Sequence, residues 1–598
     1  MSTFAEPRTA GDWLAAVKEA ERRGELLSAF DLAERGLVHH PEDISLKHRA
    51  VLALARAGST KQARRRFIEY GLAQVPAEDV ASLRARIVKD IAIAASGEAR
   101  QQQAARSAEL YAAIFDRTGG YYPAINAATL SLLAGEPDRA RELAARALRL
   151  VDGTEDYYAA ATEAEAHLLL GQADQAGTAL ARAATLRGDD EGAVATTRRQ
   201  LRLVCEATGI DQEILAVLAG RAVAHYCGHL ISSAGRFRAA DEEAVSKRIE
   251  AEVRRTTPGY AYGSLANGGD ILWAEALLAL GAELHVVLPF ARDEFVTASV
   301  APGGPDWIER FDRCLNAAKS VSYATEDAFL GDDVLFRYGA ELAMGLALLR
   351  ARYLDAEARQ LAVWDGAPAQ GAAGTAIEVA AWQKLGLPVA IVRPNGPPSN
   401  GEDSAPDAAA NPQGRVVRAL LFGDISGYSK LTDEQLPRFA QRVLGAFASA
   451  LETEAVCARN TWGDAIYVVL EDATAAASCA LELQDAIDSV DLSAEGLPPH
   501  LALRLGGHVG PVFEVEDPVT QVRSFMGSHV SRTARIEPVT PPGSVYVTEP
   551  FAAALVLART NDFVSDYVGH MPAAKDFGRL RMYSLRRREE ERAFSASS

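Results

Sequence analysis

One stretch of the sequence constrains how this chain can fold. Residues 394–414 (PNGPPSNGEDSAPDAAANPQG) are rich in Pro, Gly, Asn, Ser and Asp, and large apolar side chains are almost absent from them. Such a stretch cannot supply a hydrophobic core and is typical of a flexible linker. Because 598 residues also exceed what one core supports, we predict a linker over residues 396–413 and several folding units around it.

Charge and composition argue against several classes of protein function. The formal net charge is −18, which argues against a general nucleic-acid binder, because such proteins neutralise phosphates with clustered Lys and Arg. No apolar run approaches the roughly 20 residues of a membrane span, and the N-terminus lacks a signal-peptide pattern. Five widely spaced cysteines without a CxxC pair indicate buried thiols. We expect a cytoplasmic protein with neither a nucleic-acid nor a membrane partner.

The first segment, residues 1–212, is Ala-rich and has a helical pattern. A glycine followed five residues later by an alanine recurs after 34 and after 36 residues: Gly24 and Ala29 as Gly58 and Ala63, and Gly135 and Ala140 as Gly171 and Ala176. This period resembles that of tetratricopeptide helix pairs. We predict an α-helical repeat solenoid, with a generic helical bundle as the alternative. Either would offer a surface for a protein partner and would carry no chemistry.

The second segment, residues 215–395, alternates short apolar runs with helical stretches. The runs are AVAHYC, AYGSL, LHVVLP, SVSYA, LAVW and PVAIV. Strands that alternate with helices predict βαβ units and a parallel sheet. We therefore expect a doubly wound, Rossmann-like α/β domain.

Glycine-rich turns follow several of these runs: Cys227-Gly228-His229, GSLANGGD over 263–270, and GAAGT over 371–375. Ligands of doubly wound sheets bind at such turns, near helix N-termini. The segment resembles the Rossmann-like nucleotide-sensing family related to the LOG and DprA proteins. The resemblance implies a nucleotide-like ligand near Gly228, Gly263, Gly268, Gly374 and Thr375. A strict GxGxxG is absent, and the alternative is that the glycines only allow tight βα turns.

The third segment, residues 414–588, opens with a buried strand, RVVRALLF, that runs into GDISGYS. A predicted hairpin follows, with its turn at Trp462-Gly463-Asp464. If the two strands are neighbours, Asp424 and Asp464 meet, and paired carboxylates are what Mg²⁺ needs when it also binds phosphate. Each aspartate alone has an ordinary explanation, as a helix cap or as a turn residue.

Four motifs of this segment occur in the order found in the class III adenylate and guanylate cyclase domain. They are FGDISGYS, NTWGDAIYVV, LRLGGHVGPV (503–512) and GSHVSRTARIEP (527–538). The segment resembles that family over about residues 414 to 588. The resemblance implies an α+β, ferredoxin-like domain that acts as a homodimer and converts a nucleoside triphosphate, with ATP expected, into a 3′,5′-cyclic monophosphate. Residues 589–598 would be a disordered tail.

The resemblance also assigns roles to single residues. Two Mg²⁺ or Mn²⁺ ions per active site would bind Asp424, Asp464 and the carbonyl of Ile425. The amides of Gly427, Tyr428 and Ser429, at the N-terminus of a following helix, would hold phosphates, and Phe422 opens the same motif. Arg535 would stabilise the transition state, with Ser531 in place of the usual asparagine. Asn460 and Ser524 replace the base-reading Lys and Asp. Phe577 stands where a phosphate-binding lysine is usual, and Lys575 or Arg579 could replace it.

Two other interpretations remain open. The segment could be a catalytically silent dimerisation or binding module, with Ser531, Asn460 and Ser524 as signs of drift. Alternatively, the main activity could lie in the middle segment, for instance hydrolysis of a nucleoside's glycosidic bond. The acids that could serve there are Asp365, Glu275 and Glu378.

Overall fold

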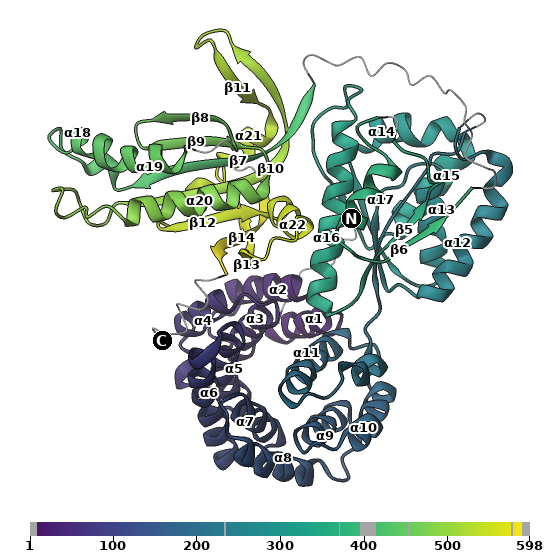
Figure 1. Cartoon of the computed structure of the whole chain (residues 1–598), viewed down its shortest axis with the longest axis vertical. Helices are drawn as coiled ribbons and strands as arrows, with labels where there is room; N and C mark the ends of the chain where they lie inside the picture. Colours follow the sequence, from purple (N-terminus) through teal and green to yellow (C-terminus); the bar gives the residue numbers. More distant parts are fainter. Residues whose placement is uncertain are drawn as a thin grey trace.

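The computed structural model describes residues 9–232, 235–369, 371–394, 414–452, 455–575 and 578–588 (Figure 1). The predicted linker, the predicted tail and Phe577 lie outside the described residues. None of the helices in the described parts of the chain combines the length and the apolarity that crossing a bilayer requires.

The first segment consists of antiparallel helices that curl into a ring, with α11 on its inner side (Figure 1). The predicted glycines end helices with positive φ, and the predicted alanines, from Ala29 to Ala176, are at most 1% exposed, which lets neighbouring helices pack closely. The helices are α1 (Ala10–Arg22), α2 (Leu26–His39), α3 (Ile44–Arg56), α4 (Thr60–Glu69), α5 (Glu78–Ala94), α6 (Gly97–Thr118), α7 (Tyr121–Leu133), α8 (Pro137–Val151), α9 (Tyr157–Leu169), α10 (Ala173–Leu186) and α11 (Glu191–Thr208).

The middle segment contains a six-stranded parallel sheet of order β4-β3-β2-β1-β5-β6. Its strands are β1 (Val223–Gly228), β2 (Tyr260–Gly263), β3 (Glu283–Leu288), β4 (Ser320–Tyr323), β5 (Ala358–Val363) and β6 (Val389–Val392). One face packs against α12 (Glu242–Thr256), α13 (Gly269–Ala279) and α15 (Pro305–Ala317), and the other against α16 (Val334–Leu354) and α17 (Thr375–Lys384). The strand order reverses between β1 and β5, where ligands of such sheets bind.

The third segment contains an eight-stranded sheet of order β13-β14-β12-β10-β7-β9-β8, with β11 paired to β10. The strands are β7 (Arg415–Ser426), β8 (Val456–Trp462), β9 (Ala465–Leu470), β10 (Ala502–Asp517), β11 (Val522–Met526), β12 (Ser544–Thr548), β13 (Phe563–Pro572) and β14 (Arg579–Arg587). Buried apolar residues of α20 (Ala473–Asp488) and α22 (Glu549–Leu557) join the core formed by the central strands. The hairpin of β10 and β11 projects from the domain (Figure 1).

Helix α16 contacts all three segments. It packs along α22, where a Cβ added at Gly345 would lie 2.7 Å from the Cβ of Ala553. Near its other end, the Arg350 guanidinium donates hydrogen bonds to the carbonyls of Gly24 (2.7 Å) and Arg23 (2.8 Å) in the first segment. A helix of the middle segment therefore joins the ring to the third segment.

Candidate active site

The central strands of the third segment bring two carboxylates together. Strands β7 and β9 are antiparallel, and Gly423 pairs with Ile466. Asp424 therefore lies beside the turn that carries Asp464. Burial and the neighbouring Asp424 carboxylate raise the pKa of Asp464. The predicted adjacency of these two aspartates is observed, and their mutual repulsion favours a bound cation.

An arginine on the other side of β7 partly neutralises this pair. Arg504 of β10 is the cross-strand partner of Asp424, and its Nη2 donates a 2.5 Å hydrogen bond to Asp424 Oδ2. Its Nε lies 2.5 Å from Glu537 Oε1, and burial raises the pKa of Glu537 to about 7. Sequence reasoning gave neither residue a role. Arg504 lies inside a recognised motif, but its position opposite Asp424 depends on strand register.

The site fits divalent cations by its donor types. Two carboxylates in contact are hard oxygen ligands, and they outnumber the one guanidinium that pairs with them. The side chain of Ile425 is a buried hydrocarbon without a ligand atom, so only its main-chain carbonyl could contribute a ligand.

The predicted phosphate-binding segment differs from expectation. Gly427 has a φ of +92°, and residues 428–430 form a single 3₁₀ turn rather than the start of a helix. The following helix begins at α18 (Leu436–Phe439), with Pro437 in its first turn. The prediction that Gly427, Tyr428 and Ser429 occupy a helix N-terminus is therefore wrong. The left-handed residue turns the chain sharply after β7, and a fixed proline φ favours starting the helix later.

Three further predicted substrate residues lie on strands. Phe422 of β7 is half-buried, with its ring 6.1 Å from that of Tyr467. Asn460 of β8 is exposed, and its Oδ1 accepts a 2.8 Å hydrogen bond from the amide of Thr461. Ser524 of β11 pairs with Val515 of β10. Across the described residues, no hydrogen bond joins Asn460 to Ser524.

The residues predicted to act on the transition state belong to a separate group. Ser531 is exposed on α21 (Ser528–Thr533), and Arg535 follows that helix. The carbonyl of Arg535 accepts a 3.1 Å hydrogen bond from the amide of Ala574, which places the segment that holds Lys575 beside it. Within the described residues, neither Arg535 nor Ser531 makes an ion pair or hydrogen bond with Asp424 or Asp464.

Buried histidines join α21 to the middle segment. His529 Nδ1 lies 2.7 Å from His508 Nε2 on β10, and His529 Nε2 lies 3.0 Å from Thr325 Oγ1. Burial lowers the pKa of His529 to about 3, so the ring is neutral near pH 7. The hydroxyl of Tyr338 on α16 also donates to the carbonyl of Val509 (2.9 Å). The strand that carries Arg504 is thus hydrogen-bonded to the middle segment.

Close backbone packing explains most of the glycines of the middle segment. A Cβ on Gly228 would lie 2.6 Å from Gly269 Cα, one on Gly263 2.6 Å from the carbonyl oxygen of Tyr226, and one on Gly268 2.6 Å from that of His229. These contacts agree with the alternative that the glycines serve tight βα turns. Gly374, with a φ of +115°, precedes α17, whose first residue is the buried Thr375.

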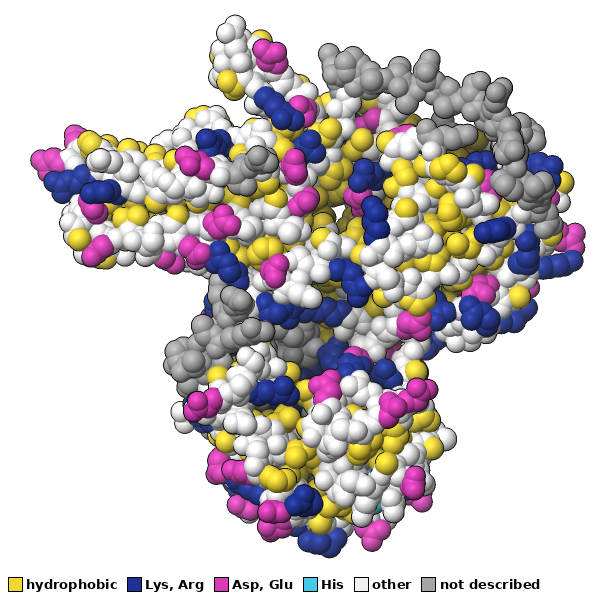
Figure 2. Space-filling model, viewed as in Figure 1, with side chains coloured by type: hydrophobic (Ala, Val, Ile, Leu, Met, Phe, Trp, Pro, Cys, Tyr) yellow, Lys and Arg dark blue, Asp and Glu magenta, His cyan; other side chains and the backbone are white. Residues whose placement is uncertain are grey.

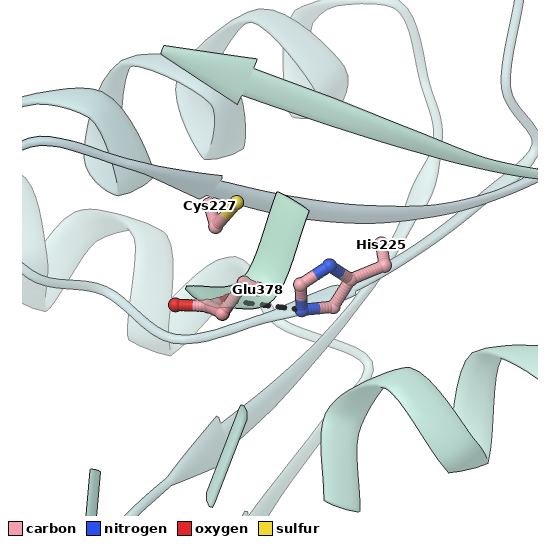
Figure 3. A group of neighbouring side chains, drawn as sticks. All are labelled: His225, Cys227 and Glu378. Carbon is pink, nitrogen blue, oxygen red and sulfur yellow. Dashed lines mark ion pairs between the residues drawn. The ribbon is translucent and has the colours of Figure 1, made fainter. Parts of the chain in front are cut away.

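A second cluster lies between β1 and α17. The side chains of His225, Cys227 and Glu378 offer nitrogen, sulfur and oxygen ligand atoms within 4.8 Å of one another (Figure 3). Burial raises the pKa of Glu378 to about 8 and lowers that of His225 to about 3. Such donors could hold a transition-metal ion. Sequence reasoning missed the two β1 residues, because alternation along an apolar run does not show which helix covers them.

The other two acids considered for catalysis in the middle segment have arginine partners. Arg236 Nε donates to Asp365 Oδ2 (2.7 Å), and Arg310 Nε donates to Glu275 Oε1 (2.9 Å). Among the three, Glu378 alone belongs to the buried cluster.

Comparison with known proteins gives one sequence match. A family model described as "Tetratricopeptide Repeats-Sensor" matches residues 23–131. No curated protein matches the chain.

Several solved structures are similar to 29% of this chain. The adenylyl cyclase CyaB from P. aeruginosa is 16% identical, with 94% of that chain covered and a TM-score of 0.27. The guanylate cyclase domain of RhGC from Catenaria anguillulae, in complex with GTP, is 17% identical, with 96% covered and a TM-score of 0.25. The guanylyl cyclase Cya2 is 20% identical, with 93% covered and a TM-score of 0.25.

Proposed function

We propose that residues 414–588 form a class III nucleotidyl cyclase domain that converts a nucleoside triphosphate, with ATP expected, into its 3′,5′-cyclic monophosphate and pyrophosphate. The adjacency of Asp424 and Asp464, in two motifs that follow the order of that family, carries the proposal. In this reaction the substrate's 3′-hydroxyl attacks its own α-phosphate, and negative charge develops on the phosphate oxygens.

The carboxylates of Asp424 and Asp464, with the carbonyl of Ile425, would hold two Mg²⁺ or Mn²⁺ ions. Bound there, the ions would lower the pKa of the hydroxyl and neutralise the triphosphate. Because Arg504 donates to Asp424, it would have to share or release that carboxylate when the ions bind. Arg504 then remains beside Glu537, where it can position the carboxylate pair.

The remaining roles are divided between the chain that holds the carboxylates and a second copy of it. The amides of Gly427, Tyr428 and Ser429 would hold phosphates at the end of β7. Arg535 and Ser531 are not joined to the carboxylates within one chain, so we propose that a homodimer supplies them from the second copy. A guanidinium fork matches the phosphate oxygens that gain charge. Lys575, beside Arg535, would add a phosphate contact.

Product analysis tests the proposal. The purified protein is incubated with Mn²⁺ and with ATP, GTP, CTP or UTP in turn, and products are resolved by mass. We expect a cyclic monophosphate from at least one of them, abolished by Asp424→Asn and retained by Asp433→Asn, which changes an exposed aspartate. Absence of a cyclic product from all four, in a protein shown to bind Mn²⁺, would refute the proposal.

A second candidate function has a specific observation in its favour. The ion pair of Arg504 with Asp424 could be permanent, and the segment would then bind nucleotides without turning them over. Titration calorimetry shows whether the protein binds ATP with Mn²⁺. A silent module would bind ATP in this experiment and release no pyrophosphate, whereas a cyclase would release it.

We also propose that the first two segments regulate the third, through a protein partner on the helices and a nucleotide-like ligand near Gly374 and Thr375. Two hydrogen bonds between the middle and third segments support this arrangement, from Tyr338 of α16 to Val509 and between Thr325 and His529. A Thr375→Val variant that still makes product but no longer responds to an added nucleotide would support the ligand site near Gly374 and Thr375. An unchanged response of this variant would count against that site.

A further inference from the structure

The helical ring surrounds a cavity with a volume of about 1120 Å³. Sites for small molecules typically measure about 300–1,000 Å³. Its walls come from the helices on the inner side of the ring, namely α3, α5, α7, α9 and α11. Arg352 and Tyr353 of α16, together with Arg586 and Arg588 at the end of β14, complete the lining. All three segments therefore contribute to this lumen.

The charge of the lumen opposes that of the whole chain. Nine Lys and Arg side chains line it against five Asp and Glu side chains, although the chain carries a net charge of −18. Lys and Arg side chains also gather on the surface where the ring meets the other two segments (Figure 2). A cavity with surplus positive charge in an acidic protein favours an anionic occupant.

A buried lysine at the lumen has only neutral partners. Lys89 is 8% exposed, and its Nζ donates to Asn126 Oδ1 (3.0 Å) and Gln200 Oε1 (2.5 Å). No carboxylate lies within ion-pair distance of it in the described residues. Arg86, one turn earlier, pairs with Asp90. A buried cation without an ion pair is costly, and an anion in the lumen would supply one.

Two further polar groups in the lining of the lumen have no hydrogen-bond partner in the described residues. The Nε of Arg56 and the hydroxyl of Ser82 are buried, and neither is hydrogen-bonded within the described parts of the chain. Buried polar groups usually have partners, so each such group requires an explanation. Both groups add unsatisfied polarity to the wall of the lumen.

We propose that the lumen of the ring binds a small phosphate-bearing molecule of nucleotide size. Arginine forks and a lysine suit phosphate oxygens. The rings of Tyr122 (44% exposed) and Tyr158 (51% exposed) offer flat faces to an aromatic base. Arg199 donates to the carbonyls of Arg56 (2.9 Å) and Tyr353 (2.6 Å), so a ligand that moves α3 or α11 also moves the end of α16. The site shares no residue with the proposed cyclase site.

Isothermal titration of the full chain with inorganic tripolyphosphate and with ADP tests the proposal. EDTA is present throughout, so that neither probe binds through metal ions at Asp424 and Asp464. We expect one binding event per chain at the lumen, which persists in Thr375→Val and is therefore distinct from any ADP bound near Gly374 and Thr375. Arg56→Gln and Lys89→Met should each weaken it about tenfold or more, the loss expected for a charge-assisted contact. The matched control is Arg84→Gln, because Arg84 is exposed on the same helix as Lys89 and does not line the lumen.

Failure of both probes to bind would overturn the proposal, as would equal affinities in the control and both lumen variants. Binding of a poly-glutamate peptide in place of both probes would also overturn it, because it would identify a protein partner. If Lys89→Met does not fold, Arg56→Gln decides the test, since Arg56 is only half-buried. Asp424→Asn should bind normally, so failure of the cyclase proposal would leave this result intact.

Discussion

At the scale of single residues, holding the carboxylates of Asp424 and Asp464 side by side lowers the stability of the folded state. Burial and Asp424 raise the pKa of Asp464, so the folded state pays for holding both carboxylates charged at neutral pH. We predict that Asp464→Asn raises the midpoint of thermal unfolding and abolishes cyclic product. Scanning calorimetry and product assays measure both effects, with Asp433→Asn as the control. Normal turnover in Asp464→Asn would contradict the account.

Lys89 gives the lumen a pH dependence. Burial and the nearby Arg86 together lower its pKa to about 8, although Glu165 and Asp90 oppose the shift. The folded state thus loses this proton at lower pH than the unfolded chain, so the group's stability penalty is complete below pH 8 and fades as pH rises above it.

We predict that the affinity of the lumen for tripolyphosphate falls between pH 7 and 9 relative to that of Lys89→Met. Comparing the affinities of the two proteins at each pH cancels the effect of the probe's own titration. If the affinities of the wild type and of Lys89→Met change in parallel across this range, Lys89 does not contact the anion.

The adjacency of Asp424 and Asp464 could be predicted from local sequence. Asp424 lies near the end of a recognisable strand, and Asp464 lies in a recognisable hairpin turn. Arg504 could not be predicted, because its hydrogen bond to Asp424 depends on the register of β10 against β7. The predicted helix start at Gly427 is wrong, because this left-handed glycine turns the chain sharply and Pro437 favours a later helix start.

At the scale of elements, α16 and α22 approach so closely that one glycine sets their distance. A Cβ on Gly345 would lie 2.6 Å from the carbonyl oxygen of Ala553. We predict that Gly345→Ala destabilises the protein by about 1–3 kcal/mol, the usual cost of overpacking.

Gly177→Ala is the matched control, because Gly177 lies inside α10 with nothing within 4 Å of the added Cβ. It should stabilise by roughly 0.5–1 kcal/mol. Urea unfolding of both variants measures the difference. Equal stabilities would show that the two helices can separate without cost.

Helices and strands with a regular apolar pattern could be predicted from the sequence. The elements of other segments that they pack against could not. The apolar runs identified the parallel strands, because strands buried on both faces have continuous apolar sequences. Nothing in the local pattern of α16 showed that it would contact the ring through Arg350 and the third segment through Tyr338. Those contacts depend on how whole segments pack.

At the scale of the whole molecule, a partly buried hydrogen bond joins the ring to the third segment. The Tyr567 hydroxyl on β13 donates to Asp31 Oδ2 (2.7 Å) on α2, and burial raises the pKa of Asp31. Tyr567→Phe leaves that carboxylate with fewer donors, so we predict a loss of about 1–3 kcal/mol in the free energy of unfolding. Tyr323→Phe, at an exposed tyrosine, should have no effect. If both variants unfold at the same urea concentration, this contact does not join the segments.

The most direct test of the central claim mixes two inactive variants. Asp424→Asn removes one half of the proposed site and Arg535→Ala the other, so each protein alone should make no cyclic product. In an equal mixture, half of the dimers carry one intact site, and about a quarter of wild-type activity should return. If the mixture stays inactive while the wild type is active and both variants dimerise, the active site is not shared between two chains in the way proposed.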